Sequence, residues 1–206
     1  FTLVTRTAEV YGIDAHRQLL YPWPKPLWKR HIKSEINSFA LSSLREQAKS
    51  KSSLRWLLIP DNRSPCTHPI WSSCSDTFSL RSASIRAKML IGRYQTQSLK
   101  AKFSIDSTKE CSLCGHTEED TLHLIALCPA TRDIREEALA KLEVLYQTDR
   151  IPSPTNPEQW CWALLNGGNY PRENGIISLS STVAQGNHIC SNFCGRLDQR
   201  RAIVID

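Results

Sequence analysis

The stretch CSLCGHTEEDTLHLIALCP, residues 111–129, gathers three cysteines and two histidines in one short segment. Cys111, Cys114, His123 and Cys128 stand in the spacing C-x2-C-x8-H-x4-C. Three thiolates and one imidazole are a common ligand set for a tetrahedral zinc ion. Because four protein ligands leave no position open for water, we predict a structural Zn²⁺ in a knuckle, not a catalytic metal.

The residues between these ligands suit such a knuckle. Gly115 can take a positive φ without strain, so the backbone can turn away after the second cysteine. Asp120 or Thr121 can cap a short helix that presents His123 to the metal. The apolar side chains within residues 122–127 are expected to fasten the knuckle to neighbouring helices.

Two other chemistries fit the same cysteines, namely a set of disulfides or a free C-x-x-C thiol pair. A redox pair normally opens a helix in a βαβ setting, and no strand pattern precedes Cys111. His116 is an alternative to His123 as the fourth ligand, although it lies too close to Cys114 to fold back easily.

The chain has eight cysteines in all, and those outside the knuckle give weaker signals. Two possible further sites each lack a clear fourth ligand: Cys66, His68 and Cys74, and His188, Cys190 and Cys194. Buried cysteines that act as small apolar residues explain both groups as well as a metal does. The clustering favours a reducing compartment, so we expect an intracellular protein of the nucleus or cytoplasm, not a secreted one.

The formal net charge of +6 is unevenly distributed. Residues 1–110 hold 18 Lys and Arg against 8 Asp and Glu, whereas residues 111–150 hold 4 against 8. A basic half of this kind is typical of a phosphate-binding surface, because neutralised phosphates release their counterions. A basic face that is merely solvated would have the same composition.

Apolar residues recur at steps of three and four along most of the chain, the period of amphipathic helices. The helices expected from this pattern cover 27–44, 77–91, 129–146 and 157–165. The stripe expected in the second is Leu80, Ala83, Ala87 and Leu90, with Gly92 as its cap. Residues 169–188 are polar and weakly patterned, and we expect a loop there. The fold class predicted is mainly α, a small helical domain with an embedded structural zinc knuckle.

Composition divides the chain into four expected regions. Residues 1–24 are an extension or the end of a preceding domain, and 25–110 are a basic helical region. Residues 111–150 are the zinc knuckle with the helix that follows it, and 151–206 are a linker, a short helix and a poorly patterned tail.

Basic and aromatic residues alternate without a clear period between Arg93 and Phe103. Aromatic faces stack on bases while Lys and Arg follow the phosphate backbone, so this segment can contact nucleic acid. An ordinary surface connector with buried Tyr94 and Phe103 is the alternative. The residues predicted to contact RNA or DNA are Lys29, Arg30, Lys33, Arg86, Lys88, Arg93, Tyr94, Lys100 and Lys102. Phe103 is a second stacking candidate.

These motifs together resemble one known family. IRAKMLIGRY at 85–94, AKF at 101–103, C-x2-C-G from Cys111, T-x-H ending at His123 and Cys128-Pro129 are similar to the carboxy-terminal tail of non-LTR (LINE-like) retrotransposon reverse transcriptases. The resemblance covers roughly residues 20–166, and it is specific only within 81–135. It implies a tail with a Cys-Cys-His-Cys zinc knuckle that grips the element's RNA or the target DNA.

The resemblance also implies a longer parent protein that is an RNA-directed DNA polymerase, and the chain begins at Phe1 without a methionine. The Tyr-x-Asp-Asp motif of a polymerase palm is absent from this chain, and we assign it no catalytic residue. Its expected partners are RNA or DNA and the other domains of the parent polyprotein, with no membrane.

A different class of function fits part of the sequence. In this second class, zinc organises a helical platform that docks on another domain of the same polyprotein, since the knuckle is acidic and the helix Trp160–Leu165 is apolar. A free-standing hydrolase has little support, because no nucleophile pattern accompanies His16, His31 or His68.

Overall fold

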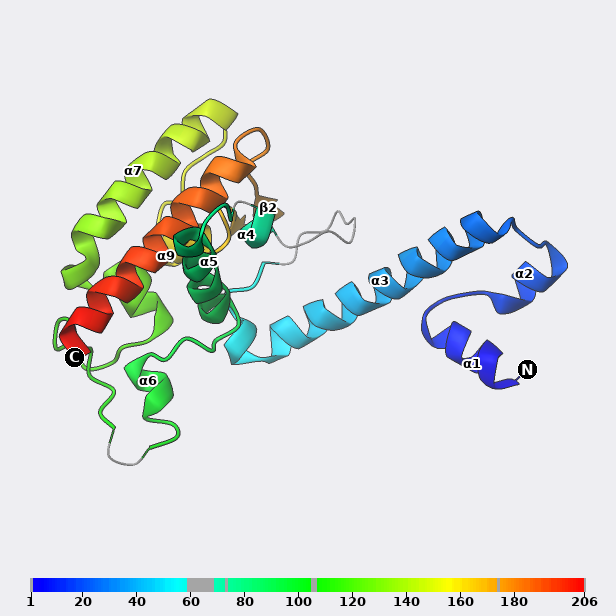
Figure 1. Cartoon of the computed structure of the whole chain (residues 1–206), viewed down its shortest axis with the longest axis horizontal. Helices are drawn as coiled ribbons and strands as arrows, with labels where there is room; N and C mark the ends of the chain where they lie inside the picture. The colour runs from blue at the N-terminus through cyan, green and yellow to red at the C-terminus, as the bar shows by residue number, and fades with distance from the viewer. Residues whose placement is uncertain (1, 59–68, 73, 105–106, 174, 206) are drawn as a thin grey trace. The chain divides into compact units, whose positions relative to one another are not determined.

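The computed structural model describes residues 2–58, 69–72, 74–104, 107–173 and 175–205 (Figure 1). Among these residues the chain is mainly helical with one two-stranded sheet, which confirms the predicted fold class. It divides into two compact units, Phe1–Lys51 and Ser52–Asp206. None of the helices within the described ranges combines the length and the apolar character that crossing a membrane requires.

The first unit consists of α1 (Thr2–Val10), α2 (Ala15–Leu20) and α3 (Lys25–Ser50). Pro26 stands in the first turn of α3, where the missing N–H costs no hydrogen bond, and the helix extends beyond both ends of the predicted span. No residue of α3 is buried, and Phe39 of this helix forms an edge-on pair with Tyr11, with 5.0 Å between ring centroids.

The second unit contains the remaining elements. They are the 3₁₀ turn η1 (Ser52–Leu54), α4 (Pro69–Ser72), α5 (Thr77–Leu90), α6 (Gln97–Lys100), the π-helical turn η2 (His123–Leu127), the 3₁₀ turn η3 (Pro129–Thr131), α7 (Arg132–Asp149), α8 (Pro157–Leu165), β1 (Tyr170–Arg172), β2 (Gly175–Ile177) and α9 (Val183–Ile205). The two strands pair antiparallel, with Tyr170 opposite Ile177.

Local chemistry fixes the ends of the helices. Asp76 forms a capping box with Ser79 at the start of α5, and Asn156 accepts a hydrogen bond from the Gln159 N–H at the start of α8. Gly92 follows α5 with φ +63°, and a side chain there would meet the backbone of Ser53 at 2.6 Å. The predicted cap at Gly92 is therefore confirmed, with a packing constraint added to the conformational one.

Helix α9 is the centre of the second unit, and it is the element that the sequence analysis missed. It packs most extensively against α5 and also against α7, and Figure 1 shows it between these two helices. The expected loop over 169–188 is in fact the hairpin β1–β2 followed by the first turn of α9, and the expected tail is this 23-residue helix. Asp149 binds the segment that leads into α9, because the Asp149 carboxylate accepts hydrogen bonds from the Ser180 N–H and the Thr182 hydroxyl.

The core face of α5 also differs from the prediction. Ala83 and Leu90 are buried as expected, but Leu80 is 51% exposed. The buried side of α5 instead includes Arg86, whose Nε donates to the Leu165 carbonyl at 2.7 Å. Burial of polar side chains between α5 and α9 therefore shifts the inner face of α5 away from its most apolar stripe.

Candidate metal centre

The cysteine turn of the knuckle is closed by backbone hydrogen bonds. The Gly115 N–H donates to the Cys111 carbonyl at 2.8 Å, and the Cys111 N–H donates to the His116 carbonyl at 2.7 Å. Gly115 has φ +73°, the left-handed conformation that the sequence analysis expected at this point. The turn thus brings both C-x2-C side chains to the same side of the chain.

The second half of the knuckle is a π-helical turn, which places the other two ligands. The Asp120 carboxylate accepts from the His123 N–H at 2.7 Å, so Asp120 is the cap of this turn. The Cys128 N–H donates to the His123 carbonyl at 2.6 Å, five residues back, and this spacing is the π-helical bond. Such single π turns occur frequently at functional sites, because the extra residue redirects side chains.

The four predicted ligands converge. One ligand atom from each of Cys111, Cys114, His123 and Cys128 lies within 4.8 Å of all the others. The Cys111 and Cys128 sulfurs are 3.9 Å apart, and the Cys114 sulfur is 3.3 Å from His123 Nε2. In a tetrahedral site with metal–sulfur bonds of about 2.3 Å, ligand atoms are separated by roughly 3.5–3.8 Å. The arrangement therefore fits a single cation bound by four protein ligands.

The alternatives to a metal fit this geometry less well. The Cys111–Cys128 separation is far beyond the roughly 2.05 Å of a disulfide bond, and each cysteine that the structure describes is a free thiol. His116 is exposed and is not part of the converging group. Its ring stacks on that of His123 with 4.4 Å between centroids, and its Nδ1 accepts from the Glu118 N–H.

Burial sets the protonation states of the ligands. Cys111, His123 and Cys128 are buried, and Cys114 is half-buried. Burial raises the pKa of Cys111 to about 12, and it also raises the pKa of Cys128. It lowers the pKa of His123, so this imidazole is neutral at pH 7 and offers a lone pair. A cation that binds here must displace thiol protons, which couples metal binding to proton release.

Further contacts anchor the ligands in the helical core. The Cys128 carbonyl accepts from the Thr131 hydroxyl at 3.1 Å and from Arg135 Nη1 at 2.9 Å. Arg135 thereby brings a positive charge next to a set of sulfurs that becomes anionic when metal binds. Leu124 and Ile125 are fully buried in the core, whereas Leu127 is exposed, so only part of the apolar segment fastens the knuckle as predicted.

One residue of this region was missed by the sequence analysis. Glu119 is completely buried, and its Oε1 accepts from Arg201 Nη2 at 2.6 Å and from the Gln97 N–H at 3.0 Å. The ion pair with Arg201 joins the knuckle to the carboxy-terminal end of α9. Nothing in the local sequence distinguishes Glu119 from the exposed Glu118 and Asp120 on either side of it.

The structure describes only part of the two further metal sites that the sequence analysis considered. His188 is exposed on α9, whereas Cys190 and Cys194 are buried and behave as core residues; Cys190 donates to the Ala163 carbonyl at 3.4 Å. Cys66 and His68 lie outside the described residues. Within the described part of the chain, the knuckle is the group that converges on a metal-sized site.

The residues predicted to contact nucleic acid fall into two groups. In the second unit, Lys88, Arg93 and Lys102 are exposed and Lys100 is half-buried. In the first unit, the three predicted contact residues on α3 are exposed: Lys29, Arg30 and Lys33.

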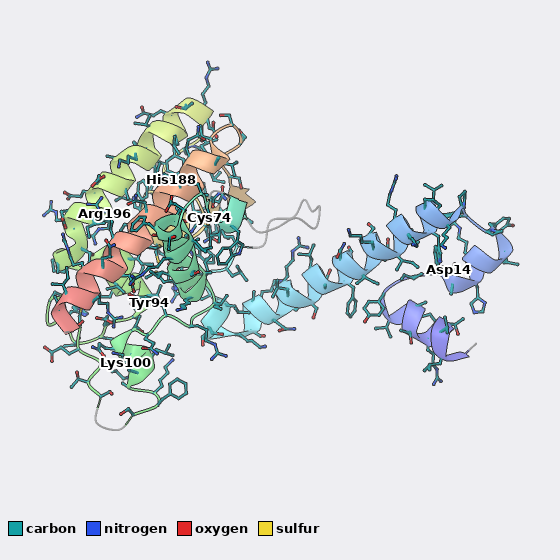
Figure 2. The ribbon with its side chains drawn as sticks, in the orientation of Figure 1. Asp14, Cys74, Tyr94, Lys100, His188 and Arg196 are labelled. Carbon is teal, nitrogen blue, oxygen red and sulfur yellow. The ribbon has the colours of Figure 1, made fainter. Side chains whose placement is uncertain are left out.

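Arg86 and Tyr94 require correction. Arg86 is fully buried, and its Nη1 donates to the Asn187 carbonyl and the Ser191 hydroxyl, both at 3.2 Å. Tyr94, labelled in Figure 2, is buried against α9 and donates to Asp198 at 3.0 Å. Neither side chain can reach a nucleic acid, because both are buried and hydrogen-bonded inside the second unit. Phe103 is 85% exposed and keeps its stacking role as a prediction.

No protein-family model, curated protein or solved structure matches this chain in comparison.

Proposed function

We propose that this chain is a nucleic-acid-binding module held together by a structural zinc ion, and that it is the carboxy-terminal region of a retrotransposon reverse transcriptase. The convergence of three thiols and one imidazole within 4.8 Å is the observation that supports the metal. Zinc is the cation favoured by this donor set, because three sulfurs and one imidazole nitrogen in a tetrahedron are typical of structural zinc sites.

Zinc would act here on folding, not on chemistry. When bound, it neutralises the thiolates and links the cysteine turn to the π-helical turn. Structural zinc sites of this kind contribute on the order of 10 kcal/mol, which is comparable with the whole stability of a domain. The chain's own residues hold the ion: Asp120 caps the turn that carries His123, and Arg135 fixes Cys128.

Binding to RNA or DNA is supported by the exposed cations of both units and by the net charge of +6. Lys88, Arg93 and Lys102 in the second unit are exposed to solvent, so they can neutralise phosphates. Fluorescence anisotropy with a labelled single-stranded RNA tests this function. We expect the logarithm of the association constant to fall steeply with the logarithm of salt concentration, and a chain that retains no RNA at low salt would refute it.

The metal and the family are tested separately. Elemental analysis of the purified protein should find one equivalent of zinc per chain. The genomic sequence upstream of the codon for Phe1 should encode a polymerase palm with a Tyr-x-Asp-Asp motif. An unrelated upstream sequence would contradict the retroelement origin while leaving the zinc site intact.

A protein-interaction module remains the second candidate, and α3 is the observation that favours it. This helix exposes Ile36, Phe39 and Leu44, each at about 40%. The helix that suggested this role in the sequence no longer supports it, because Cys161, Ala163 and Leu164 of α8 are buried in the core. Capture of a separately expressed polymerase domain, lost in a Phe39→Ser variant, would favour this role over nucleic-acid binding.

A further inference from the structure

A groove of about 560 Å³ lies on the second unit, lined by residues of α5, of the turn after it and of α9. Four of its lining residues are cationic and one is anionic: Arg81, Lys88, Arg93, Arg201 and Asp198. The sequence separates the two sides of this groove by about a hundred residues, so only the folded chain brings these charges together.

The floor of the groove is held rigidly by buried contacts. Arg201 is bound by Glu119 at 2.6 Å, and its guanidinium lies over the Tyr94 ring at 5.3 Å. The Tyr94 hydroxyl donates in turn to Asp198 at 3.0 Å. Burial raises the pKa of Tyr94 well above its ordinary value, so the hydroxyl keeps its proton at pH 7. The Arg201 Nη2 and the Tyr94 hydroxyl are thus engaged by these contacts, whereas the buried Arg201 Nε has no hydrogen-bond partner among the described residues.

The rim of the groove carries the charges that remain available. Arg81 contacts Asp198 at 3.4 Å and therefore neutralises the single carboxylate of the lining. Lys88 and Arg93 are exposed, and neither forms an ion pair with any residue that the structure describes. Because Glu119 already balances Arg201, the groove keeps a net charge of about +2, located on these two side chains.

The arrangement of the rim suits a chain of phosphates. The two available cations are neighbours, because Lys88 lies in the last turn of α5 and the Arg93 N–H donates to the Lys88 carbonyl at 2.7 Å. Phosphates of a stacked strand follow one another every 3.4 Å or so along the axis, so two neighbouring cations can contact nearby phosphates of one strand. An acidic peptide would fit less well, since protein partners need exposed apolar anchors and the apolar lining here, Ile85 and Tyr94, is buried.

We propose that this groove binds the phosphodiester backbone of a nucleic-acid strand, through Lys88 and Arg93. The proposal rests on the proposed function and locates it on one surface of the second unit. Bases are not read here, because the only aromatic ring among the lining residues is buried beneath Arg201. Binding in the groove is therefore independent of sequence and strongly dependent on salt.

The test compares three charge-neutralised proteins with the wild type, all zinc-loaded and full-length. The groove variant is Lys88→Gln with Arg93→Gln, and the α3 variant is Lys29→Gln with Arg30→Gln and Lys33→Gln. The matched control is Arg172→Gln, because Arg172 is an exposed cation of β1 outside the groove. Affinities for a labelled oligouridine and for a labelled mixed-sequence RNA are measured by anisotropy over a range of salt concentrations.

The groove variant should bind both RNAs at least tenfold more weakly at low salt. The slope of log affinity against log salt should fall by roughly 1.4 in magnitude, about 0.7 for each lost contact with a single strand. Zinc content and circular dichroism should be unchanged, and Arg172→Gln should resemble the wild type.

Two results would overturn the groove while leaving nucleic-acid binding in place. In the first, the groove variant binds like the wild type and the α3 variant loses affinity. In the second, Arg172→Gln weakens binding as much as one groove substitution, which indicates a general effect of net charge. If the wild type itself fails to bind RNA at low salt, the proposed function fails, and the groove proposal fails with it.

Discussion

His116 and His123 have stacked rings, yet only His123 presents a nitrogen to the sulfurs, with Nε2 at 3.3 Å from Cys114. The two histidines therefore form an internal comparison for the metal site. They are separated by seven residues, and both are near the cysteines in the sequence. Only the cap at Asp120 and the π-helical turn decide which of them is buried among the thiols.

We predict that His123→Ala abolishes stoichiometric zinc binding and lowers the melting temperature, whereas His116→Ala keeps both near wild type. Removing one of four ligands opens the coordination shell and weakens the free energy that binding adds to folding. Elemental analysis and thermal unfolding followed by circular dichroism measure the two effects. Equal zinc content in the two variants would show that the fourth ligand has been assigned wrongly.

Gly195 provides a second test at this scale, because it lies where α9 packs tightly against Ser82 of α5. A Cβ at this position would lie 2.1 Å from Ser82 Oγ and 2.9 Å from Ser82 Cβ. An alanine in a helix normally stabilises it by about 1 kcal/mol relative to glycine. Here the overlap with Ser82 reverses the sign, and we predict that Gly195→Ala destabilises the protein by about 1–3 kcal/mol.

The free energy of unfolding in urea measures this effect, and a compensating change provides the control. Gly195→Ala combined with Ser82→Gly should recover part of the loss, because the second change removes both atoms that the new methyl group meets. A stabilised Gly195→Ala single variant would mean that α5 and α9 are not in this close contact.

The sequence predicted correctly that Cys111, Cys114, His123 and Cys128 converge, because their spacing depends on two local turns. It could not identify the burial of Arg86, and it offered a buried Tyr94 only as an alternative, because the partners of these residues lie about a hundred positions later in α9. An arginine beside a lysine on α5 has the same local pattern whether it faces solvent or the core. The role of Glu119 was hidden for the same reason, since Arg201 is 82 residues away.

At the scale of elements, helices with a regular apolar period were predicted and α9 was not. The buried face of α9 includes Asn187, Cys190, Ser191 and Gly195, which are polar or small. Hydrophobic periodicity detects helices that bury large apolar side chains, and it fails where polar groups are paired inside the core. Here Arg86 of α5 supplies the pairing, because it binds the Asn187 carbonyl and the Ser191 hydroxyl.

Helices α7 and α9 are joined by exposed ion pairs that should make their association sensitive to acid. Glu137 accepts from Lys141 at 2.6 Å and from Arg196 at 2.5 Å, and these bonds lower its pKa to about 2. Asp133 binds Arg200, which also lowers the pKa of this carboxyl group. A carboxylate with a lowered pKa stabilises the folded state above its ordinary pKa, and this contribution is lost as the pH falls toward the folded value.

We predict that Glu137→Gln lowers the urea midpoint slightly at pH 7 and that the difference from wild type shrinks between about pH 4.5 and pH 2. Glu136→Gln is the matched control, because the ion pair of Glu136 with Arg132 lies within α7 and does not join α7 to α9. The effect should be small, since exposed pairs are screened by solvent and salt. A difference that grows on acidification would contradict the assigned direction.

At the scale of the whole molecule, the knuckle is integrated into the second unit. It belongs to the same compact unit as the helices, and Leu124 and Ile125 are part of the common core. The ion pair of Glu119 and Arg201 connects it to α9 and to the floor of the basic groove. The candidate metal site and the groove are therefore connected through one buried ion pair.

This shared contact leads to a prediction that separates metal loss from loss of the ion pair. Chelation of zinc should lower both stability and RNA affinity, because the knuckle then no longer holds Glu119 against Arg201. Glu119→Gln should keep the zinc but leave Arg201 buried without an opposite charge, which costs about 3–5 kcal/mol and loosens the groove.

Glu118→Gln is the control, since Glu118 is exposed and accepts one long bond from Ser98 at 3.4 Å. Zinc content, urea unfolding and RNA anisotropy are measured on the same samples. If Glu119→Gln matches Glu118→Gln in stability and affinity, the knuckle and the groove are independent, and zinc supports the fold without shaping the surface that binds RNA.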